Sequence, residues 1–325
     1  MNSYIAGLGI YLPEKVLTNF DLEKIVETSD EWIRTRSGIS ERRIADADTA
    51  TSDLSIIAAK KAIEDAQVSP EEIDAIILGT ATPDMLFPST ACVVQGKLAA
   101  NRAMAFDISA GCSGFLYGLG IADSMIKNGF ENVLVIGAET LSKVMDFTDR
   151  STCVLFGDGA GAAIVRRSSS DNRGIIATYF RADGADWKLL YQPAGGSRIP
   201  ASKESVEKRL HYIKMEGNEV FKLAVRAMIE AAVETLKKAN VPASEVGLLI
   251  PHQANIRIIE ATAKRLEIPM ERVYVNLDKY GNTSAASIPI ALYEALKEGR
   301  IKSGDYVLLV AFGAGFTWAG VLLRW

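Results

Sequence analysis

The sequence predicts an α/β protein of five layers, α-β-α-β-α, made of two duplicated halves. Two observations carry this prediction. The first is an internal repeat, in which Ala66–Ile77 resembles Ala239–Ile250 at an offset of 173 residues and Val133–Ile136 matches Val307–Val310 at an offset of 174. The second is that each copy alternates helical patterns with short apolar strands, an order typical of a mainly parallel sheet covered by helices.

Two central helices are predicted to be enclosed. Residues 108–122 and 281–293 form helical patterns with no polar face to show to water, so each must lie between two sheets. Amphipathic helices over residues 53–66 and 219–240 would then cover the outer faces of those sheets. Together these helices and strands give the five layers.

No linker rich in proline, serine or charge separates the two copies. The polar stretch over residues 166–173 is the best candidate for the seam. We therefore divide the chain into an N-terminal half of residues 1–170 and a C-terminal half of residues 171–325.

Bulk properties exclude several classes of protein. A formal net charge of -4, from 36 basic and 40 acidic residues, provides no overall attraction to nucleic acid or anionic lipid. Residues 306–323 carry no charge and reach the length of a membrane span, but their glycines favour two buried strands joined by a turn, so no membrane insertion is expected. Three cysteines and the absence of a secretory signal pattern predict a reducing cytoplasm.

Cys112 is the cysteine that the sequence singles out. It lies in the small-residue segment Ser109–Gly114, where the first enclosed helix is expected to begin. Because amide dipoles at a helix N-terminus favour thiolate, we expect the pKa of the Cys112 thiol to fall from about 8.5 to around 7 or below. The alternative role, a small buried apolar residue, fits Cys92 and Cys153 better because their neighbours are apolar.

The sequence contains only two histidines. His211 sits in the alternating segment Arg209–Ile213, which predicts an exposed or half-buried strand residue. His252 follows the buried strand Val246–Ile250, at the carboxyl end of a strand of the predicted parallel sheet, where α/β proteins build their sites. His252 is therefore the candidate for chemistry.

Asn282 is the internal counterpart of Cys112. Gly111 and Cys112 match Gly281 and Asn282 at an offset of 170 residues. If the two enclosed helices pack about a pseudo-twofold axis, their N-termini bring Cys112 and Asn282 to one pocket. An ordinary helix N-cap is the alternative role for Asn282.

These residues belong to longer motifs that resemble the β-ketoacyl-acyl carrier protein synthase III family, whose members are condensing enzymes of the thiolase fold. The resemblance covers nearly the whole chain. It is carried by Thr28–Ile33, Arg36–Ile39, Ala110–Gly114, Phe156–Gly161, Pro251–Arg257, Gly281–Ser287 and Phe312–Trp318. It implies a thiolase-like sandwich and the decarboxylative condensation of an acyl-coenzyme A primer with malonyl-acyl carrier protein. The product would be 3-oxoacyl-acyl carrier protein, which initiates fatty acid biosynthesis.

The resemblance also implies a role for each candidate. Cys112 would attack the acyl-coenzyme A thioester and carry the acyl group covalently. His252 and Asn282 would donate hydrogen bonds to the malonyl thioester oxygen during decarboxylation. The backbone amides of Cys112 and Ala314 would hold the oxyanion, and no cofactor or metal is implied. Ala314 replaces a glycine that the family usually carries, so its methyl group is expected to narrow the pocket or to restrict the loop.

Further positions match the family's binding residues. By resemblance, coenzyme A and its pantetheine arm would contact Thr28, Trp32, Arg36, Arg150, Gly217, Asn218, Phe221 and Asn255. A local basic face for the acidic acyl carrier protein would comprise Arg257, Lys264 and Arg265. Phe87 aligns with a residue that reaches across a dimer interface to shape the acyl pocket, which implies a homodimer.

Several alternatives fit parts of the pattern. Gly157–Ala162 superficially matches a dinucleotide fingerprint, but the following residues run into a polar turn too soon for a phosphate-binding helix. A papain-like hydrolase also uses Cys, His and Asn, yet it needs no duplicated scaffold. A non-catalytic carrier-binding protein would not need all three polar residues. A relative from specialised metabolism, acting on a different acceptor, stays open, as do the length and branching of the primer.

Overall fold

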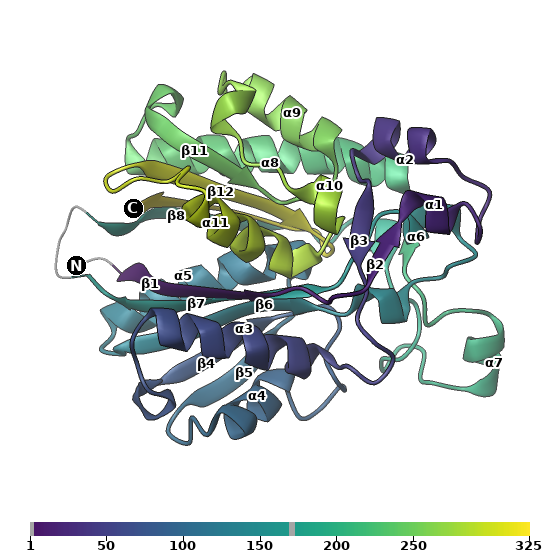
Figure 1. Ribbon diagram of the computed structural model, residues 1–325, viewed down its shortest axis with the longest axis horizontal. Helices are drawn as coiled ribbons and strands as arrows, with labels where there is room; N and C mark the ends of the chain where they lie inside the picture. The colour runs from purple at the N-terminus through teal and green to yellow at the C-terminus, as the bar shows by residue number, and fades with distance from the viewer. Residues whose placement is uncertain (1–2, 169–172) are drawn as a thin grey trace.

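Two mixed β-sheets form the framework of the computed structural model, which describes residues 3–168 and 173–325 (Figure 1). The strand order in the first sheet is β1-β7-β6-β4-β5. Its strands are β1 (Ser3–Tyr11), β4 (Ala75–Gly79), β5 (Met104–Ile108), β6 (Asn132–Glu139) and β7 (Gly159–Arg167). The order in the second sheet is β11-β12-β13-β8. Its strands are β8 (Gly174–Ala182), β11 (Val246–Pro251), β12 (Tyr306–Gly313) and β13 (Thr317–Arg324).

The two sheets repeat one strand order. In the first, β4 runs parallel to β6, β6 is antiparallel to β7, and β7 is antiparallel to β1. In the second, β11 runs parallel to β12, β12 is antiparallel to β13, and β13 is antiparallel to β8. β5 extends the first sheet parallel to β4, and at the equivalent place Val273 makes a parallel bridge to Leu249 of β11. The predicted boundary at residues 170 and 171 lies outside the described residues.

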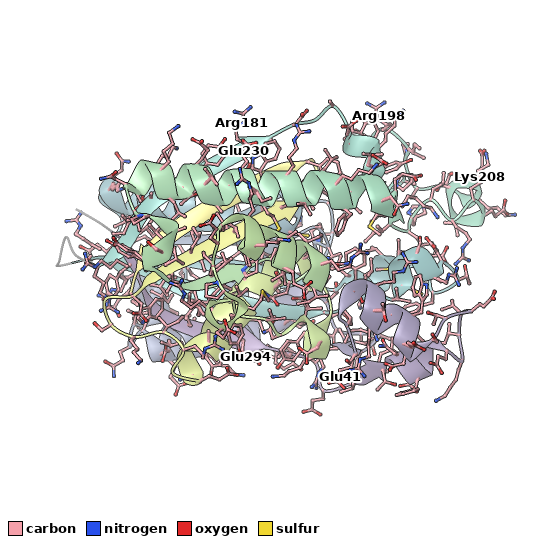
Figure 2. The ribbon with its side chains drawn as sticks, turned by 90° about the horizontal axis from the view of Figure 1, so that it is seen from above. Glu41, Arg181, Arg198, Lys208, Glu230 and Glu294 are labelled. Carbon is pink, nitrogen blue, oxygen red and sulfur yellow. The ribbon has the colours of Figure 1, made fainter. Side chains whose placement is uncertain are left out.

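Helices lie between and outside the sheets, in the five layers that the sequence predicts. α5 (Gly114–Lys127) and α11 (Ser287–Lys297) lie between the sheets and contact strands of both. α3 (Thr51–Asp65) and α4 (Thr90–Leu98) cover the outer side of the first sheet. α8 (Gly217–Ala239) and α9 (Ile256–Arg265) cover the second, and Figure 2 shows α8 along its length.

The central helices begin later than the sequence patterns predict. Residues 104–108 form β5, and Gly111–Ser113 form a one-turn 3-10 helix, so α5 starts only at Gly114. In the second copy the 3-10 turn Ser284–Ala286 precedes α11. Gly111 and Gly281 have φ values of +51° and +63°, which glycine adopts without strain and which interrupt a right-handed helix. The two helical patterns therefore include turns at their N-terminal ends.

The charge-free stretch of residues 306–323 forms the two strands predicted for it. β12 and β13 pair antiparallel, with Phe312 opposite Trp318 and Gly313 opposite Thr317. Nearly all of their side chains are buried in the second sheet. Among the helices of the described residues, none is both long and apolar enough to span a bilayer.

Short elements gather at one end of the sheets (Figure 1). They are β2 (Val16–Thr18), α1 (Asn19–Leu22), α2 (Asp30–Ser37), β3 (Glu41–Arg43), α6 (Arg150–Cys153), β9 (Leu190–Tyr191), α7 (Lys203–Glu207), β10 (Lys214–Met215) and α10 (Leu277–Tyr280). The strand predicted around His211 is wrong, although His211 is half-buried. His211 lies in a turn after α7, where Arg209 has a positive φ that ends any extended run, and its Nε2 lies 2.9 Å from Ser205 Oγ.

Candidate active site

Cys112 sits on the 3-10 turn between β5 and α5. The turn lies so close to the first sheet that a Cβ on Gly79 would be 2.6 Å from the Gly114 carbonyl carbon. The equivalent turn of the second copy is equally close, because a Cβ on Gly137 would be 2.2 Å from the Ala285 carbonyl oxygen. Small residues therefore let both turns pack directly on the sheet, and Cys112 is half-buried there.

The loop between β12 and β13 lies against the backbone of Cys112. A Cβ on Gly313 would be 2.4 Å from the Cys112 nitrogen, and a Cβ on Gly111 would be 2.7 Å from the Ala314 nitrogen. Neither Cys112 nor Ala314 donates its backbone N–H to an acceptor in the described part of the chain. Ala314 does not adopt a positive φ, so the methyl group that replaces a glycine hydrogen causes no backbone strain.

His252 follows β11 and is almost fully buried. Its backbone N–H donates to the Val310 carbonyl at 2.8 Å, and its Nδ1 lies 2.7 Å from Ser287 Oγ. The Ser287 hydroxyl accepts the Gln253 N–H at 3.4 Å, so its own proton is directed to Nδ1. This bond favours the tautomer in which Nε2 carries the hydrogen, and Nε2 has no partner among the described residues.

Three hydrogen bonds fix the backbone and the side-chain oxygen of Asn282. Its N–H donates to the Leu155 carbonyl at 2.8 Å, and its C=O accepts the Gly157 N–H at 3.0 Å. Its side-chain Oδ1 accepts the Ser284 N–H at 2.8 Å. Just before it, the Tyr280 hydroxyl donates to Glu294 of α11, which is labelled in Figure 2. The Nδ2 amide makes no hydrogen bond to a described residue, so it is the free donor of Asn282.

The segment Asn282–Ser287 lies between the turn of Cys112 and the ring of His252. The Ser284 N–H donates to Asn282 Oδ1 at 2.8 Å, and the turn Ser284–Ala286 packs against the turn Gly111–Ser113 that carries Cys112. Ser287 Oγ lies 2.7 Å from His252 Nδ1. One short segment therefore contains Asn282 and packs next to both Cys112 and His252.

The thiol and the imidazole are both neutral in this site at neutral pH. Burial raises the pKa of the Cys112 thiol to about 12, against the opposing hydrogen bond from Ser284. Burial also lowers the pKa of His252 to about 3. The expectation that the Cys112 pKa falls to around 7 is wrong for this state. Cys112 lies on a 3-10 turn ahead of α5, and its loss of hydration outweighs the pull of the helix N-terminus.

A buried arginine from the N-terminal strands supports Asn282. Arg42 of β3 is fully buried and donates to the carbonyl oxygens of Leu17 at 3.1 Å and Val154 at 2.7 Å. Burial lowers the pKa of Arg42 to about 10, so it stays charged at neutral pH. Leu155, which follows Val154, accepts the N–H of Asn282. Arg42 thus helps to place the Asn282 backbone.

Trp32, Arg36 and Arg150 form one cluster at the end of the sheets that carries α2. The guanidinium carbons of Arg36 and Arg150 lie 5.9 and 5.2 Å from the Trp32 ring centroid. Nearby in the chain, the Thr28 hydroxyl is buried and has no hydrogen-bond partner among the described residues. The cluster offers an aromatic face, two cations and an unsatisfied hydroxyl, which suit a ligand with a planar ring and phosphates.

The other predicted contact residues lie at the starts of α8 and α9. Gly217 and Asn218 are the first two residues of α8 and are exposed. The Arg257 guanidinium carbon lies 5.2 Å from the Phe221 ring centroid. Asn255 caps α9 by accepting the Arg257 N–H at 2.9 Å, and its Nδ2 donates to a carbonyl of α2 at 3.0 Å. The Asn255 side chain therefore ties α9 to α2, so both ends of its amide already have partners.

The three predicted basic docking residues are exposed on α9. Arg257 and Lys264 share one face of the helix, while Arg265 is turned from them by roughly 80°. No ion pair among the described residues involves any of the three. Exposed Glu260 lies on the same face between Arg257 and Lys264, so the three basic residues leave this side of α9 with a net positive charge.

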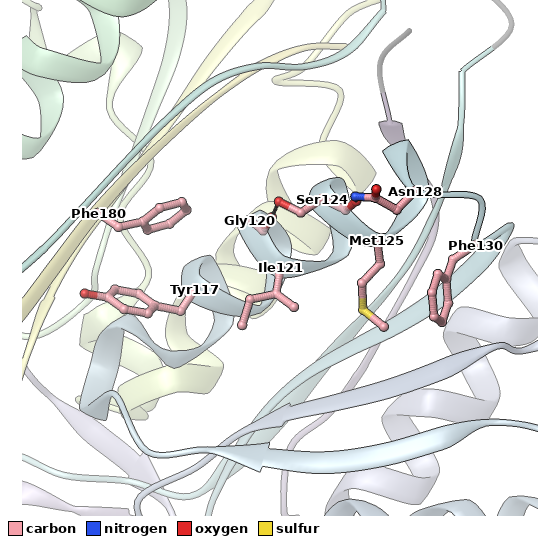
Figure 3. A pocket seen from close by; sticks show the side chains of 8 residues that line it. All are labelled: Tyr117, Gly120, Ile121, Ser124, Met125, Asn128, Phe130 and Phe180. Atoms are coloured by element: carbon pink, nitrogen blue, oxygen red, sulfur yellow. Dashed lines mark hydrogen bonds between the residues drawn. The ribbon is translucent and has the colours of Figure 1, made fainter.

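Phe87 projects from the loop between β4 and α4, with 84% of its surface exposed. It contacts no other candidate within this chain. β5, at the edge of the first sheet, has one side free of strand partners. A cavity of about 460 Å³ lies on α5 beside β8, away from Cys112, and Figure 3 shows its lining. The apolar lining residues are Tyr117, Ile121, Met125, Phe130 and Phe180.

Three residues at the site were not singled out from sequence. Ser284 and Ser287 lie inside the motif Gly281–Ser287, where only Asn282 was assigned a role. Glu139 is fully buried and interacts with Ser284. A signal for it exists, because a lone carboxyl ends the otherwise apolar strand β6 at its carboxyl end, where sites are built in parallel sheets.

Comparisons with known proteins bear on this geometry. Residues 106–184 match the family described as 3-oxoacyl-[acyl-carrier-protein (ACP)] synthase III, and residues 236–325 match the C-terminal part of that synthase. Over 322 residues the chain is 62% identical to the β-ketoacyl-[acyl-carrier-protein] synthase III of Caldanaerobacter subterraneus subsp. tengcongensis, covering 99% of this chain and 97% of the relative. This protein belongs to the β-ketoacyl-acyl carrier protein synthase III family.

Crystal structures of synthase III enzymes share the fold. The enzyme from Aquifex aeolicus is 57% identical, with a TM-score of 0.91 over 99% of this chain and 100% of its own. The enzyme from Pseudomonas aeruginosa is 40% identical, with a TM-score of 0.92 over 100% and 98%. As a synthase III family member, the chain is an acyltransferase of the thiolase fold, as the sequence predicts. The family condenses acyl-coenzyme A with malonyl-acyl carrier protein to initiate fatty acid synthesis.

Proposed function

We propose that this synthase III carries out its condensation through Cys112, His252 and Asn282. The observation that carries the proposal is the segment Asn282–Ser287, which includes Asn282, bonds to His252 through Ser287 and packs against the turn that carries Cys112. In the first step the Cys112 sulfur attacks the acyl-coenzyme A thioester and retains the acyl group. The free N–H groups of Cys112 and Ala314 face the same turn, so they can hold the oxyanion that forms in this step.

In the second step, His252 and Asn282 receive the malonyl thioester. The Nε2–H of a neutral His252 and the free Nδ2–H of Asn282 both donate to the thioester oxygen. Loss of carbon dioxide then leaves an enolate whose charge these donors stabilise, each by roughly 3 kcal/mol. The enolate carbon attacks the acyl group on Cys112. The low pKa of His252 keeps it a neutral donor across the physiological range.

Coenzyme A would bind at the cluster of Trp32, Arg36 and Arg150. The indole suits the adenine ring, and the two guanidinium groups suit phosphates. Thr28 would gain a partner for its buried hydroxyl. The pantetheine arm would run past Gly217, Asn218 and Phe221, with Asn255 helping to align α9 and α2.

Acyl carrier protein would dock on the basic face of α9, which is formed by Arg257, Lys264 and Arg265. Arg257 also stacks on Phe221, so changing it would disturb two binding sites at once. Lys264→Glu is the cleaner test: KM for malonyl-acyl carrier protein should rise, and KM for acyl-coenzyme A should stay the same. Equal changes in both KM values would remove the docking proposal.

A homodimer would cover three features that one chain leaves exposed. They are the unpaired edge of β5, the protruding Phe87 and the cavity on α5 (Figure 3). Phe87 would enter the partner's acyl pocket and limit primer length. Sedimentation of the full chain should give twice the chain mass, and Phe87→Ala should shift primer preference; a monomer that retains full activity contradicts this.

The compartment follows from the thiols. All three cysteines are free, and a thiol nucleophile works only while it stays reduced. We therefore place the reaction in a reducing cytoplasm.

The condensation itself is tested with purified enzyme, acyl-coenzyme A, malonyl-acyl carrier protein and radiolabelled primer. Label should appear on Cys112 before the second substrate is added, and carbon dioxide should be released with 3-oxoacyl-acyl carrier protein. Label on another residue would overturn the proposed roles. Comparing acetyl, branched and longer primers in the same assay gives the primer range.

A priming role in specialised metabolism is the second candidate. The chain is 35% identical to the priming β-ketosynthase of the R1128 polyketide pathway, with a TM-score of 0.91. Its identity to the 3-oxoacyl-[acyl-carrier-protein] synthase III of Aquifex aeolicus is higher, at 57%. Fatty acid initiation is therefore favoured.

A further inference from the structure

The two N–H groups proposed to hold the oxyanion lie on segments from different halves of the chain. Cys112 is in the turn Gly111–Ser113, and Ala314 is in the loop between β12 and β13. An oxyanion hole works only when both donors lie within hydrogen-bonding distance of one oxygen atom. The contacts that set the distance between this turn and this loop therefore matter for the reaction.

The loop and the turn approach each other without side chains between their backbones. A Cβ on Gly313 would be 3.0 Å from the Ser113 nitrogen and 3.1 Å from the Ala110 carbonyl oxygen. Within the described part of the chain, no backbone–backbone hydrogen bond joins residues 109–114 to residues 311–318. Any hydrogen bond between the two segments therefore involves a side chain.

Thr317, the first residue of β13, makes such a bond from the loop side. Its hydroxyl donates to the Ala110 carbonyl oxygen at 2.7 Å. The same carbonyl accepts the Ser113 N–H at 3.2 Å, and this second bond closes the 3-10 turn that carries Cys112. A displacement of the Thr317 hydroxyl would therefore displace the carbonyl group on which the turn is built.

Ser113 makes a second bond, from the side of the turn. Its hydroxyl donates to the Thr317 carbonyl oxygen at 3.2 Å, and the Ser113 side chain is fully buried. Among the described residues, these two side-chain bonds are the only hydrogen bonds between residues 109–114 and residues 311–318. Because they join the segments at two different points, they fix the orientation of the loop as well as its distance from the turn.

The methyl group of Thr317 fixes the direction of its hydroxyl. A Cβ on Gly315 would be 3.0 Å from the Thr317 methyl carbon, so the methyl group packs against the loop while the hydroxyl faces the turn. A branched β-carbon restricts rotation about the Cα–Cβ bond. Since both branches are in contact, the Thr317 side chain has one orientation in this structure.

The loop is attached to the second sheet by bonds that do not involve the Thr317 side chain. Thr317 pairs with Gly313 of β12 and with Ala182 of β8. Next to it, Phe316 and Asp183 exchange two backbone hydrogen bonds, at 2.7 and 2.9 Å. Loss of the Thr317 hydroxyl would leave these bonds in place. The loop would keep its own conformation and lose its alignment with the turn.

We propose that Thr317 is a positioning residue that sets the separation between the Cys112 and Ala314 N–H groups. This inference rests on the proposed role of these two groups in holding the oxyanion. Thr317 takes no part in the bond changes of the reaction, because its hydroxyl proton is already donated to Ala110. It acts on the rate through the geometry of the two donors.

Thr317→Val tests this role, because valine has the same branched shape and lacks the hydroxyl. The maximal rate of acetyl transfer from radiolabelled acetyl-coenzyme A to Cys112 should fall about 10- to 100-fold, since misplacing a catalytic group by about 1 Å has an effect of that size. The half-saturating concentration of acetyl-coenzyme A should stay the same, because the oxyanion forms only during the reaction. An unchanged maximal rate would overturn the proposal.

Alkylation of Cys112 by iodoacetamide separates this role from a general disturbance of the turn. The thiol then displaces iodide from a saturated carbon, so no oxyanion forms and the two N–H groups are not needed. Thr317→Val should therefore be alkylated at Cys112 at the wild-type rate, as measured by peptide mass spectrometry on the full chain. Equal slowing of alkylation and acylation would show that the thiol itself has moved, and the positioning role would be wrong.

Two further variants serve as matched controls. Thr317→Ser keeps the hydroxyl, so its acylation rate should stay within about threefold of wild type. Thr235→Val removes a comparable hydroxyl, which donates to the Ala231 carbonyl at 2.6 Å within α8, and its acylation rate should be unchanged. If Thr317→Ser is as slow as Thr317→Val, the hydroxyl is not the group that matters, and the proposal fails.

Ser113→Ala gives an independent test of the same contact. It removes the bond to the Thr317 carbonyl, so acylation should slow by about 3- to 10-fold while alkylation by iodoacetamide stays the same. If Thr317→Val does not fold, Ser113→Ala decides, and an unchanged acylation rate in that variant overturns the proposal. Wild-type enzyme that acquires no label on Cys112 would instead overturn the proposed function, so the two failures are distinguishable.

Discussion

Each copy of the fold has a turn with a glycine of positive φ, and the residue after that glycine has a different proposed role in each copy. Gly111 precedes Cys112 with a φ of +51°, and Gly281 precedes Asn282 with a φ of +63°. Cys112 leaves its backbone N–H free and presents a thiol. Asn282 has its N–H, its C=O and its side-chain oxygen all bonded, and presents one NH₂ group. The same backbone start thus supports a nucleophile in one copy and a fixed donor in the other.

The difference arises from the length of the second turn. α5 begins two residues after Cys112, whereas α11 begins five residues after Asn282. The additional residues include Ser284, whose N–H donates to the side-chain oxygen of Asn282. A duplicated scaffold therefore gains a second chemistry through a local change in loop length, while its strand order stays the same.

The largest effect is expected from Cys112→Ser. The less nucleophilic hydroxyl should reduce acyl-enzyme formation by at least about 10³-fold, because both steps pass through the sulfur. Mass measurement of the intact protein after incubation with acetyl-coenzyme A reports the acyl adduct. A variant that still acquires the adduct at the wild-type rate would show that the nucleophile lies elsewhere.

Asn282→Ala should affect only the second step. Acyl-enzyme formation should proceed as in wild type, and condensation should slow by about 10²- to 10³-fold, since one hydrogen bond to the enolate oxygen is lost. Rapid-quench measurement of the two steps separates them. Equal slowing of both steps would contradict the proposal that Asn282 acts only in condensation.

Gly111→Ala and Gly281→Ala sharpen the comparison through the backbone. Each new Cβ would meet backbone atoms at 2.7 Å, from Ala314 in one case and Leu155 in the other, at a positive φ. Each variant should lose about 1–3 kcal/mol of unfolding free energy in urea. Gly111→Ala should also slow acylation, and Gly281→Ala should slow condensation.

Gly96→Ala in α4 is the control for these two variants. No atom lies within 4 Å of a Cβ at Gly96, and its φ is not positive. Alanine within a helix is favoured over glycine, so stability should stay the same or rise by about 0.5–1 kcal/mol. If all three variants behave alike, the close approach of the two turns is not what makes Gly111 and Gly281 necessary.

Stability should also depend on pH, because one titrating group from each half should lower the unfolding free energy on a different side of neutrality. His252 has a pKa of about 3 when folded and 6.5 when unfolded. The unfolded chain therefore binds the extra proton, and stability falls as the pH decreases from 6.5 towards 3, by at most about 1.4 kcal/mol per pH unit. The Cys112 pKa is about 12 when folded and 9.0 when unfolded, so stability falls as the pH rises from 9 towards 12.

Urea unfolding over a pH series measures both limbs. His252→Gln should flatten the acid limb, and Cys112→Ser should flatten the alkaline limb, while other titrating groups contribute equally to all three proteins. Variants whose limbs both coincide with wild type would contradict the burial that shifts these pKa values.

Much of the fold follows from local patterns. Residues 306–323 form two strands because glycines interrupt the apolar run, a signal that lies within the segment itself. The starts of α5 and α11 were misplaced because the positive φ of Gly111 and Gly281 depends on close packing against other segments, which periodicity does not record. His211 was misplaced for a similar reason, since alternation over a few residues also occurs in a turn.

The site is harder to predict than the fold. The expectation that Cys112 and Asn282 share a pocket comes from the repeat, because equivalent positions in duplicated halves are expected to meet near a pseudo-twofold axis. The Cys112 pKa does not follow, since it depends on burial and on Glu139, neither of which local sequence specifies. β6, which ends at Glu139, packs against the turn Ser284–Ala286 from the other half of the chain, so only the assembled sheets bring them together.

Arg42 is out of reach of any substrate, yet it should behave genetically as part of the reaction centre. Its guanidinium joins Leu17 to Val154, and a lysine at this position offers no fork to span both carbonyl oxygens. An allele that encodes Arg42→Lys should accumulate acyl-enzyme that does not go on to condense with the malonyl substrate. A screen for loss of lipid synthesis should therefore recover residue 42 alongside the residues that touch substrate.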